Sequence, residues 1–215
     1  MPGSMVITGG EGDLGQAIAG EFRTAGWQAT APGRMELDVT ASESVTAFFK
    51  DSQTDLLVCN AGLVRDLPLL KLSEDDWDAV MAVNLTGAAR CAKAALRGML
   101  KRRSGHVVFI SSFSALHPPA GQAAYAAAKA SLIGLGKSLA CEVGPAGIRV
   151  NVVLPGFLET RMTAGVSEGR RGQVKSEHVL GRFNTAEAVA RFIRSLQEDL
   201  PHTSGQVFQL DSRIS

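Results

Sequence analysis

Short apolar runs alternate with longer amphipathic segments along almost the whole chain. The short runs are rich in Val, Ile, Leu and Phe, as β-strands are, whereas the longer segments repeat apolar residues every three or four positions, as helices do. The pattern predicts strands over residues 5–8, 28–31, 35–38, 56–60, 106–111, 149–154 and 206–210. It predicts helices over residues 13–25, 42–50, 74–102, 123–143 and 186–197.

Two of these strands, 106–111 and 149–154, are apolar at nearly every position. A strand of this kind is covered on both faces, as in a parallel sheet. The regular alternation of strands and helices is typical of βαβ units. We therefore expect an α/β fold: one Rossmann-type domain over residues 1–215, with a doubly wound parallel sheet of about seven strands and helices on both faces.

The connection between the second and third predicted strands is unusually short. Only residues 32–34 separate them, whereas a parallel crossover normally needs about a dozen residues. Either an atypical tight connection joins the two strands or one of the assignments is wrong. We retain both strands as the prediction.

Composition narrows the class of protein. The 215 residues are 45% hydrophobic and 20% charged, with a net charge of +1, so no global field attracts nucleic acid or an acidic membrane. Cys59, Cys91 and Cys141 lie far apart among apolar neighbours, which favours buried thiols over a disulfide or a metal site. No apolar segment has the length of a membrane span. We expect a cytoplasmic protein without a metal, nucleic-acid or membrane partner.

A glycine-rich turn follows the first predicted strand. Gly9, Gly12 and Gly15 would let the backbone approach a pyrophosphate, whose charge is met by amides at the start of the next helix. A plain strand-to-helix turn is the alternative. The position directly after the first strand favours a dinucleotide site.

Tyr125 and Lys129 lie four residues apart on the predicted helix 123–143. Residues at this spacing share a face, so the ammonium group can lie beside the phenol. A neighbouring cation favours the phenolate, and we therefore expect the pKa of Tyr125 to be lowered towards neutrality.

These motifs, in this order, resemble those of the short-chain dehydrogenase/reductase family, and within it the 3-oxoacyl-(acyl carrier protein) reductases. The resemblance covers nearly the whole chain, in residues 8–15, 38–40, 60–62, 83–85, 110–112, 125–129 and 151–160. It implies that Tyr125 donates or accepts the proton and that Ser112 hydrogen-bonds the substrate oxygen. It also implies that Lys129 lowers the Tyr125 pKa and holds the nicotinamide ribose, and that Asn84 anchors a proton-relay water.

The resemblance also implies a set of residues that bind the dinucleotide. They are Gly9, Gly12, Asp13, Leu14, Gly15, Arg34, Asp38, Val39, Asn60, Ala61, Gly62, Tyr125, Lys129, Pro155, Gly156 and Thr160. Members that prefer NADP often carry a basic residue where this chain has Gly12. Arg34 remains near the end of the second strand, where a guanidinium can grip a 2′-phosphate. We expect NADP(H) to be favoured over NAD(H).

Two positions depart from the family pattern. Asp13 replaces a usual glycine, and its carboxylate would either cap the helix or repel a pyrophosphate; we expect capping. At the C-terminus, Asp211, Ser212 and Arg213 stand where the family usually has Asp-Gly-Gly. An altered substrate-end wall or subunit contact would follow.

Residues 160–184 are predicted to form a mobile substrate lid. The segment contains several glycines and an excess of basic residues, namely Arg161, Arg170, Arg171, Lys175 and Arg182. It suits a phosphate-bearing substrate arm or an acidic carrier, and a solvated loop is the alternative. Arg103 matches a carrier-docking arginine of the resembled reductases, whereas the second such position is Ala146.

The sequence thus predicts an NADP(H)-dependent carbonyl reductase or alcohol dehydrogenase. Its substrate would be a small-molecule carbonyl compound or an acyl thioester, with acyl carrier protein as a candidate partner. A dinucleotide-sensing regulatory protein is the alternative, and a nucleotide-sugar enzyme would need a larger C-terminal region. Segments 83–95 and 125–139 are rich in Ala and Gly, which indicates either a homodimer or homotetramer interface or tight packing on the sheet.

Overall fold

One parallel sheet forms the centre of the computed structural model, which describes residues 3–214. In this part of the chain the sheet has six strands, in the order β2-β1-β3-β4-β5-β6. They are β1 (Ser4–Ile7), β2 (Gln28–Thr30), β3 (Leu56–Cys59), β4 (Gly105–Ile110), β5 (Ile148–Leu154) and β6 (Val207–Gln209). All neighbouring pairs are parallel.

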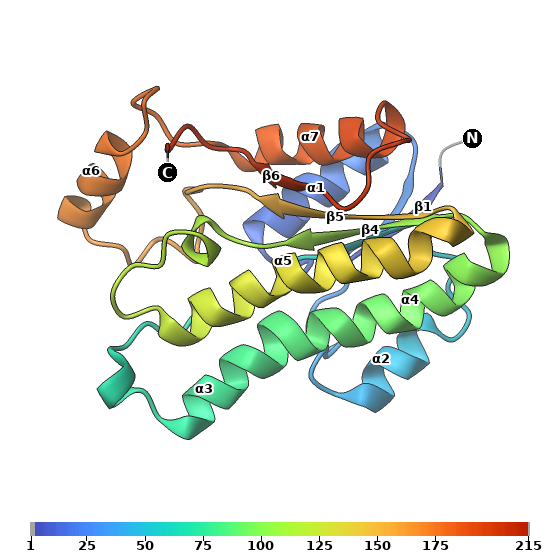
Figure 1. The fold of residues 1–215 in the computed structure, drawn as a ribbon, viewed down its shortest axis with the longest axis horizontal. Coiled ribbons are helices and arrows are strands. Elements are labelled where there is room, and N and C mark those ends of the chain that lie inside the picture. Colours follow the sequence, from blue (N-terminus) through green and yellow to red (C-terminus); the bar gives the residue numbers. More distant parts are fainter. Residues whose placement is uncertain (1–2, 215) are drawn as a thin grey trace.

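Helices cover both faces of the sheet (Figure 1). They are α1 (Asp13–Thr24), α2 (Ser42–Phe49), α3 (Glu74–Met81), α4 (Ala88–Arg102), α5 (Ala123–Val143), α6 (Glu168–Ser176) and α7 (Ala186–Glu198). Because successive strand residues point to opposite faces, Val108 and Ile110 pack beneath α1 and α7, while Val107 packs beneath α4 and α5. The predicted doubly wound α/β fold is confirmed.

The predicted helix 74–102 is continuous but not uniform. Ser73 caps its start by accepting a hydrogen bond from the Asp76 amide at 3.1 Å. α3 then passes through a π-helical turn, η2 (Ala82–Gly87), into α4. π-helical turns inside longer helices occur frequently at functional sites.

The predicted strand 35–38 is wrong. Residues 34–36 form a turn, in which the amides of Glu36 and Leu37 both donate to the Gly33 carbonyl. The connection through residues 32–34 is too short for a crossover, so the chain leaves β2 and runs directly towards α2. Leu37 and Val39 are nevertheless buried, and this accounts for the alternating pattern that resembled a strand.

Two further expectations need correction. Cys59 and Cys91 are buried, but Cys141 is exposed, because it lies on the outer side of α5. α6 was not expected, since Val174 is the one residue it buries and its apolar periodicity is correspondingly weak. Within residues 3–214, no helix is both long and apolar enough to span a membrane.

A buried polar cluster joins β4 and β5 to α7. His106, whose side chain is fully buried, lies with Nδ1 2.8 Å from Gln197 Oε1 and Nε2 3.0 Å from Asn151 Nδ2. An amide nitrogen can only donate, so Nε2 accepts, Nδ1 donates and the ring is neutral. Burial, assisted by the nearby charge of Arg149, lowers the pKa of His106 to about 3.

We predict that this histidine destabilises the protein in mild acid. When the pH falls below about 6.5, His106 becomes protonated in the unfolded chain but stays neutral in the folded protein. The free energy of unfolding therefore decreases. From pH 7 to pH 5 the contribution of His106 to the free energy of unfolding should fall by about 2 kcal/mol. Urea unfolding of the wild type and of His106→Gln at both pH values tests this. Equal pH dependence in the two proteins would contradict it.

Candidate active site

The candidate site lies at the carboxyl ends of the strands, at the point in the sheet where the order of strand addition reverses. From β1 the chain passes through α1 to β2 on one side, and it later returns to β3 on the other side of β1. In open parallel sheets, ligands bind in the crevice at such a switch point. A cavity of about 640 Å³ opens here.

The structure brings almost all of the predicted site residues to this cavity. All of them line it except Gly15 and Asn84. Gly15 packs behind the glycine-rich turn, where an added Cβ would lie 2.6 Å from the Gly9 carbonyl oxygen. Asn84 lies one layer behind the loop that follows β3 and is 1% exposed.

The glycine-rich turn has the geometry that a pyrophosphate requires. Gly9 has a φ of +66°, and a Cβ there would lie 2.8 Å from the Ala61 Cα. Gly12 is the N-cap of α1, and no side chain caps the helix, so the amides of its first turn have no side-chain acceptor. The turn and the helix terminus therefore fit a dinucleotide phosphate.

Thr8 ties this turn to the loop after β3. Its buried hydroxyl accepts the backbone amides of Asn60 and Ala61, both at 3.0 Å. Asn60 Nδ2 in turn donates to the carbonyls of Thr8 and Gly9. Sequence analysis did not include Thr8 in the site, although a hydroxyl at the end of a buried strand was the available signal.

The expectation that Asp13 caps α1 is wrong. Asp13 is the first residue of the helix, and its carboxylate binds Arg161 from the predicted lid. Arg161 Nε lies 2.8 Å from Oδ1, and the Arg161 amide donates to Oδ2 at 2.6 Å. These hydrogen bonds lower the pKa of Asp13. Sequence analysis counted Arg161 only as one of the lid's basic residues.

Arg34 and Asp38 line the cavity beyond the end of β2. The Arg34 side chain is 81% exposed, and its Nε lies 3.6 Å from Asp38 Oδ2. Asp38 Oδ1 accepts the amide and the hydroxyl of Thr40, which lowers the pKa of Asp38. Arg34 is therefore loosely held at the place where the adenosine end of a dinucleotide would lie.

Asn84 connects the π-helical turn to the loop after β3. Its Nδ2 donates to the carbonyls of Leu63 and Val80, at 2.8 Å and 2.9 Å, and its Oδ1 accepts the Leu63 amide at 3.3 Å. Both amide hydrogens are used in these bonds. The Asn84 side chain therefore fixes the loop that carries Gly62.

Ser112, Tyr125 and Lys129 converge on the cavity from β4 and α5. Lys129 is 3% exposed, and its Nζ donates to the Ile110 carbonyl at 2.8 Å and lies 5.7 Å from the centre of the Tyr125 ring. Burial lowers the pKa of Lys129 to about 8. Ser112 Oγ accepts the Ser114 amide at 3.2 Å.

The expected lowering of the Tyr125 pKa is wrong for this arrangement. Burial raises the pKa; an interaction with Ser112 opposes this, and the carboxylate of Asp66 reinforces it. Lys129 directs its ammonium group towards the Ile110 carbonyl and not towards the phenol oxygen. The phenol therefore stays protonated at neutral pH.

A polar wall and residues of the predicted lid enclose the other end of the cavity. Ser114 Oγ donates to Gln122 Oε1 at 2.8 Å, and Gln122 Nε2 donates to Asp66 Oδ2 at 2.7 Å. Gly156, with a φ of +84°, lies so close to Asp211 that an added Cβ would be 2.5 Å from the Asp211 Cβ. Residues on this wall that sequence analysis left out of the site include Phe113, Phe157, Met162 and Arg213.

Comparison with known proteins agrees with this geometry. Residues 6–212 match the family described as enoyl-(acyl carrier protein) reductase. The 3-oxoacyl-[acyl-carrier-protein] reductase FabG of Aquifex aeolicus (strain VF5) is 37% identical over 97% of this chain and 86% of its own length. The protein of the same name from Escherichia coli (strain K12) is 41% identical over 73% of this chain and 64% of its own length.

A solved structure has the same fold. The oxidoreductase of the short chain dehydrogenase/reductase family from Burkholderia thailandensis superposes with a TM-score of 0.90 at 29% identity, over 99% of this chain and 92% of that one. These similarities do not support the regulatory alternative. The chain belongs to the short-chain dehydrogenase/reductase family and is an NAD(P)-dependent oxidoreductase that acts on carbonyl and CH–OH groups.

Proposed function

We propose that the protein reduces a 3-oxoacyl thioester with NADPH, and that Tyr125 donates the proton. The observation that carries this proposal is the convergence of Ser112, Tyr125 and Lys129 on the cavity that the glycine-rich turn also lines. The similar proteins named as 3-oxoacyl-[acyl-carrier-protein] reductases support the substrate class.

The residues of the cavity divide between holding the dinucleotide and handling the proton. When bound, the nicotinamide supplies the hydride to the carbonyl carbon. The amides at the start of α1 would hold the pyrophosphate, and the loop of Asn60, Ala61 and Gly62 would border the nicotinamide side. Lys129 would hold the ribose beside it.

Tyr125 and Ser112 would receive the carbonyl oxygen of the substrate. Because the pKa of Tyr125 is raised, the phenol keeps its proton at neutral pH and can deliver it to the developing alkoxide. Ser112 would donate a hydrogen bond to the same oxygen. Lys129, with a pKa of about 8, is still a cation at pH 7 and would stabilise the phenolate that remains.

Arg34 is the proposed source of a preference for NADPH. Its exposed guanidinium follows β2 and, among residues 3–214, is held only by the 3.6 Å ion pair with Asp38. A guanidinium in this position can bind a 2′-phosphate in a bidentate manner.

The position of Arg103 does not favour docking of a carrier protein beside this chain's own cavity. Arg103 follows α4 and precedes β4, so it lies at the edge of the sheet opposite the cavity of its own chain. Its Nη2 donates to the Pro145 carbonyl at 2.8 Å. We therefore propose the thioester itself as the recognised group.

The free, buried thiols of Cys59 and Cys91 support a reducing, cytoplasmic compartment.

We also propose that α4 and α5 form the contact of a homodimer, which can double to a homotetramer. The outer side of α5 carries small residues, and a Cβ at Gly134 would meet no atom within 4 Å. Small residues at this site permit close approach of a second helix.

Tyr125→Phe should lower turnover by about 10²- to 10⁴-fold, because the ring remains but the proton donor is lost. Binding of NADPH, measured by fluorescence titration, should be almost unchanged. Reduction of an acetoacetyl thioester at the wild-type rate would contradict the assignment of Tyr125.

Arg34→Ala should weaken NADPH binding by about 1.5–3 kcal/mol, the range for a hydrogen bond to a charged group. Binding of NADH should change little, since NADH lacks the 2′-phosphate, and it serves as the internal control. If both dinucleotides lose affinity equally, Arg34 is structural and the preference has another source.

Gly134→Arg should dissociate the oligomer and reduce activity, because Tyr125 and Lys129 lie on the same helix. Gly20→Arg on α1 is a matched control, since Gly20 also has open space around it. Analytical ultracentrifugation at micromolar concentration measures both variants. A fully active wild-type monomer would refute the proposed assembly.

A further inference from the structure

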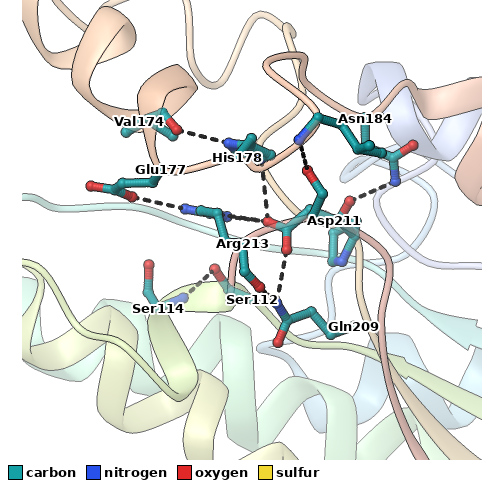
Figure 2. Close-up of polar contacts among 12 residues, drawn as sticks. Ser112, Ser114, Val174, Glu177, His178, Asn184, Gln209, Asp211 and Arg213 are labelled. Atoms are coloured by element: carbon teal, nitrogen blue, oxygen red, sulfur yellow. Dashed lines mark hydrogen bonds and ion pairs between the residues drawn. The ribbon is translucent and has the colours of Figure 1, made fainter. Parts of the chain in front are cut away.

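The end of the chain is joined to the end of the predicted lid. His178 and Arg213 form an isolated antiparallel bridge, and the Val179 amide donates to the Ser212 carbonyl at 3.1 Å. Figure 2 shows these segments meeting around Asp211. The two residues that replace the family's glycines, Ser212 and Arg213, therefore help to build the substrate end of the cavity.

Asp211 holds Arg213 in a fixed orientation. The Asp211 side chain is fully buried, and its Oδ2 accepts from Arg213 Nε at 2.7 Å and pairs with Nη2 (Figure 2). Its Oδ1 accepts from Gln209 Nε2 at 2.9 Å, and His178 Nε2 lies 3.6 Å from Oδ2. The Nε and Nη2 edge of the guanidinium is thus already bound to Asp211.

The rest of the Arg213 guanidinium lies beside the catalytic serine. Its central carbon is 3.4 Å from the centre of the Phe113 ring, and Phe113 directly follows Ser112. Arg213 lines the same cavity as Ser112 and Tyr125. Among residues 3–214, its Nη1 makes no hydrogen bond, and its one ion pair is with Glu177 Oε2 at 3.9 Å. A donor is therefore available close to the proposed position of the reacting carbonyl.

The surrounding charges indicate which acceptor this donor suits. Asp211 and Glu177 already balance the charge of Arg213, and Asp66 adds a carboxylate to the same end of the cavity. A substrate carboxylate that bound Nη1 would also face the carboxylates of Asp211 and Glu177, which already pair with this guanidinium and would repel it. A neutral carbonyl oxygen can accept the hydrogen bond without that repulsion.

We propose that Arg213 is a specificity-determining residue, which binds through Nη1 the second carbonyl oxygen of a neutral 1,3-dicarbonyl substrate. This inference rests on the proposed function, because Ser112 and Tyr125 must take the first carbonyl oxygen. It predicts that the enzyme prefers an oxoacyl thioester both to the free oxo acid and to a simple ketone.

The test compares three substrates: the acetoacetyl thioester of N-acetylcysteamine, acetoacetate and 2-pentanone. Their kcat/KM values are measured for the wild type, Arg213→Met and Arg213→Lys. Arg182→Met is the matched control, because Arg182 is an exposed arginine of the lid and does not line the cavity. Calorimetric binding of the corresponding 3-hydroxybutyryl thioester to the enzyme loaded with NADP⁺ gives a second readout that needs no turnover.

Arg213→Met should lower kcat/KM for the thioester roughly 10- to 100-fold, the effect of losing a charge-assisted hydrogen bond, and should change the ketone value less than about threefold. The kcat/KM of Arg213→Lys for the thioester should lie between the values of the wild type and of Arg213→Met. The Arg182→Met control should match the wild type. Equal losses of kcat/KM for the thioester and the ketone would show that Arg213 only shapes the cavity, and would overturn the proposal. No loss of kcat/KM for either substrate would also overturn it.

If the wild type reduces none of the three compounds, the proposed function fails, and calorimetry still decides the role of Arg213. Tighter binding of the hydroxy thioester by the wild type than by Arg213→Met supports the proposal. Equal binding, or binding by neither protein, overturns it.

Discussion

The site depends on the close approach of two backbone segments, the turn after β1 and the loop after β3. Thr8 accepts two amides of that loop, and Gly9 lies so near Ala61 that no side chain fits between them. Asn84 fixes the far end of the same loop by two hydrogen bonds with Leu63. Because parallel strands β1 and β3 are neighbours in the sheet, these few bonds set the floor of the cavity that the glycine-rich turn, Ser112 and Tyr125 line.

A second constraint is the burial of a cation next to Tyr125. Lys129 is held by the Ile110 carbonyl, and the Lys129 carbonyl accepts from the Ser111 hydroxyl at 2.7 Å. These bonds lock α5 to the end of β4, so the distance between Ser112 and Tyr125 is determined by the core and not by a flexible loop. Burial without a carboxylate partner explains why the pKa of Lys129 falls to about 8. The ammonium is thus prepared for a ligand oxygen.

Much of this arrangement could be predicted from the sequence, because periodicity and chain order determine which ends of strands meet. The helices 13–25 and 123–143 were recovered to within a residue, and the glycine-rich turn was placed at the edge of the sheet. The predictions that were wrong concerned features that depend on long-range contacts. The segment 35–38 alternates like a strand, but Leu37 is its one buried side chain, and Met35 is exposed. The pKa of Tyr125 is raised mainly by burial, and Lys129 turns its ammonium group to the Ile110 carbonyl; residue spacing determines neither feature.

Two of the departures from the family pattern, Asp13 and Arg213, carry charges, and in the folded chain each of these charges has a partner. Asp13, beside the pyrophosphate position, pairs with Arg161 across 148 residues of sequence, and Arg213 pairs with Asp211. An unpaired carboxylate at the start of α1 would repel the dinucleotide, whereas the Asp13–Arg161 pair has no net charge and draws the lid towards the cleft. Asp13 and Arg213 are therefore compatible with dinucleotide chemistry, because each forms an ion pair with a side chain of opposite charge. The Asp13–Arg161 pair also joins the predicted lid to α1, and the Asp211–Arg213 pair fixes the Arg213 side chain at the cavity wall.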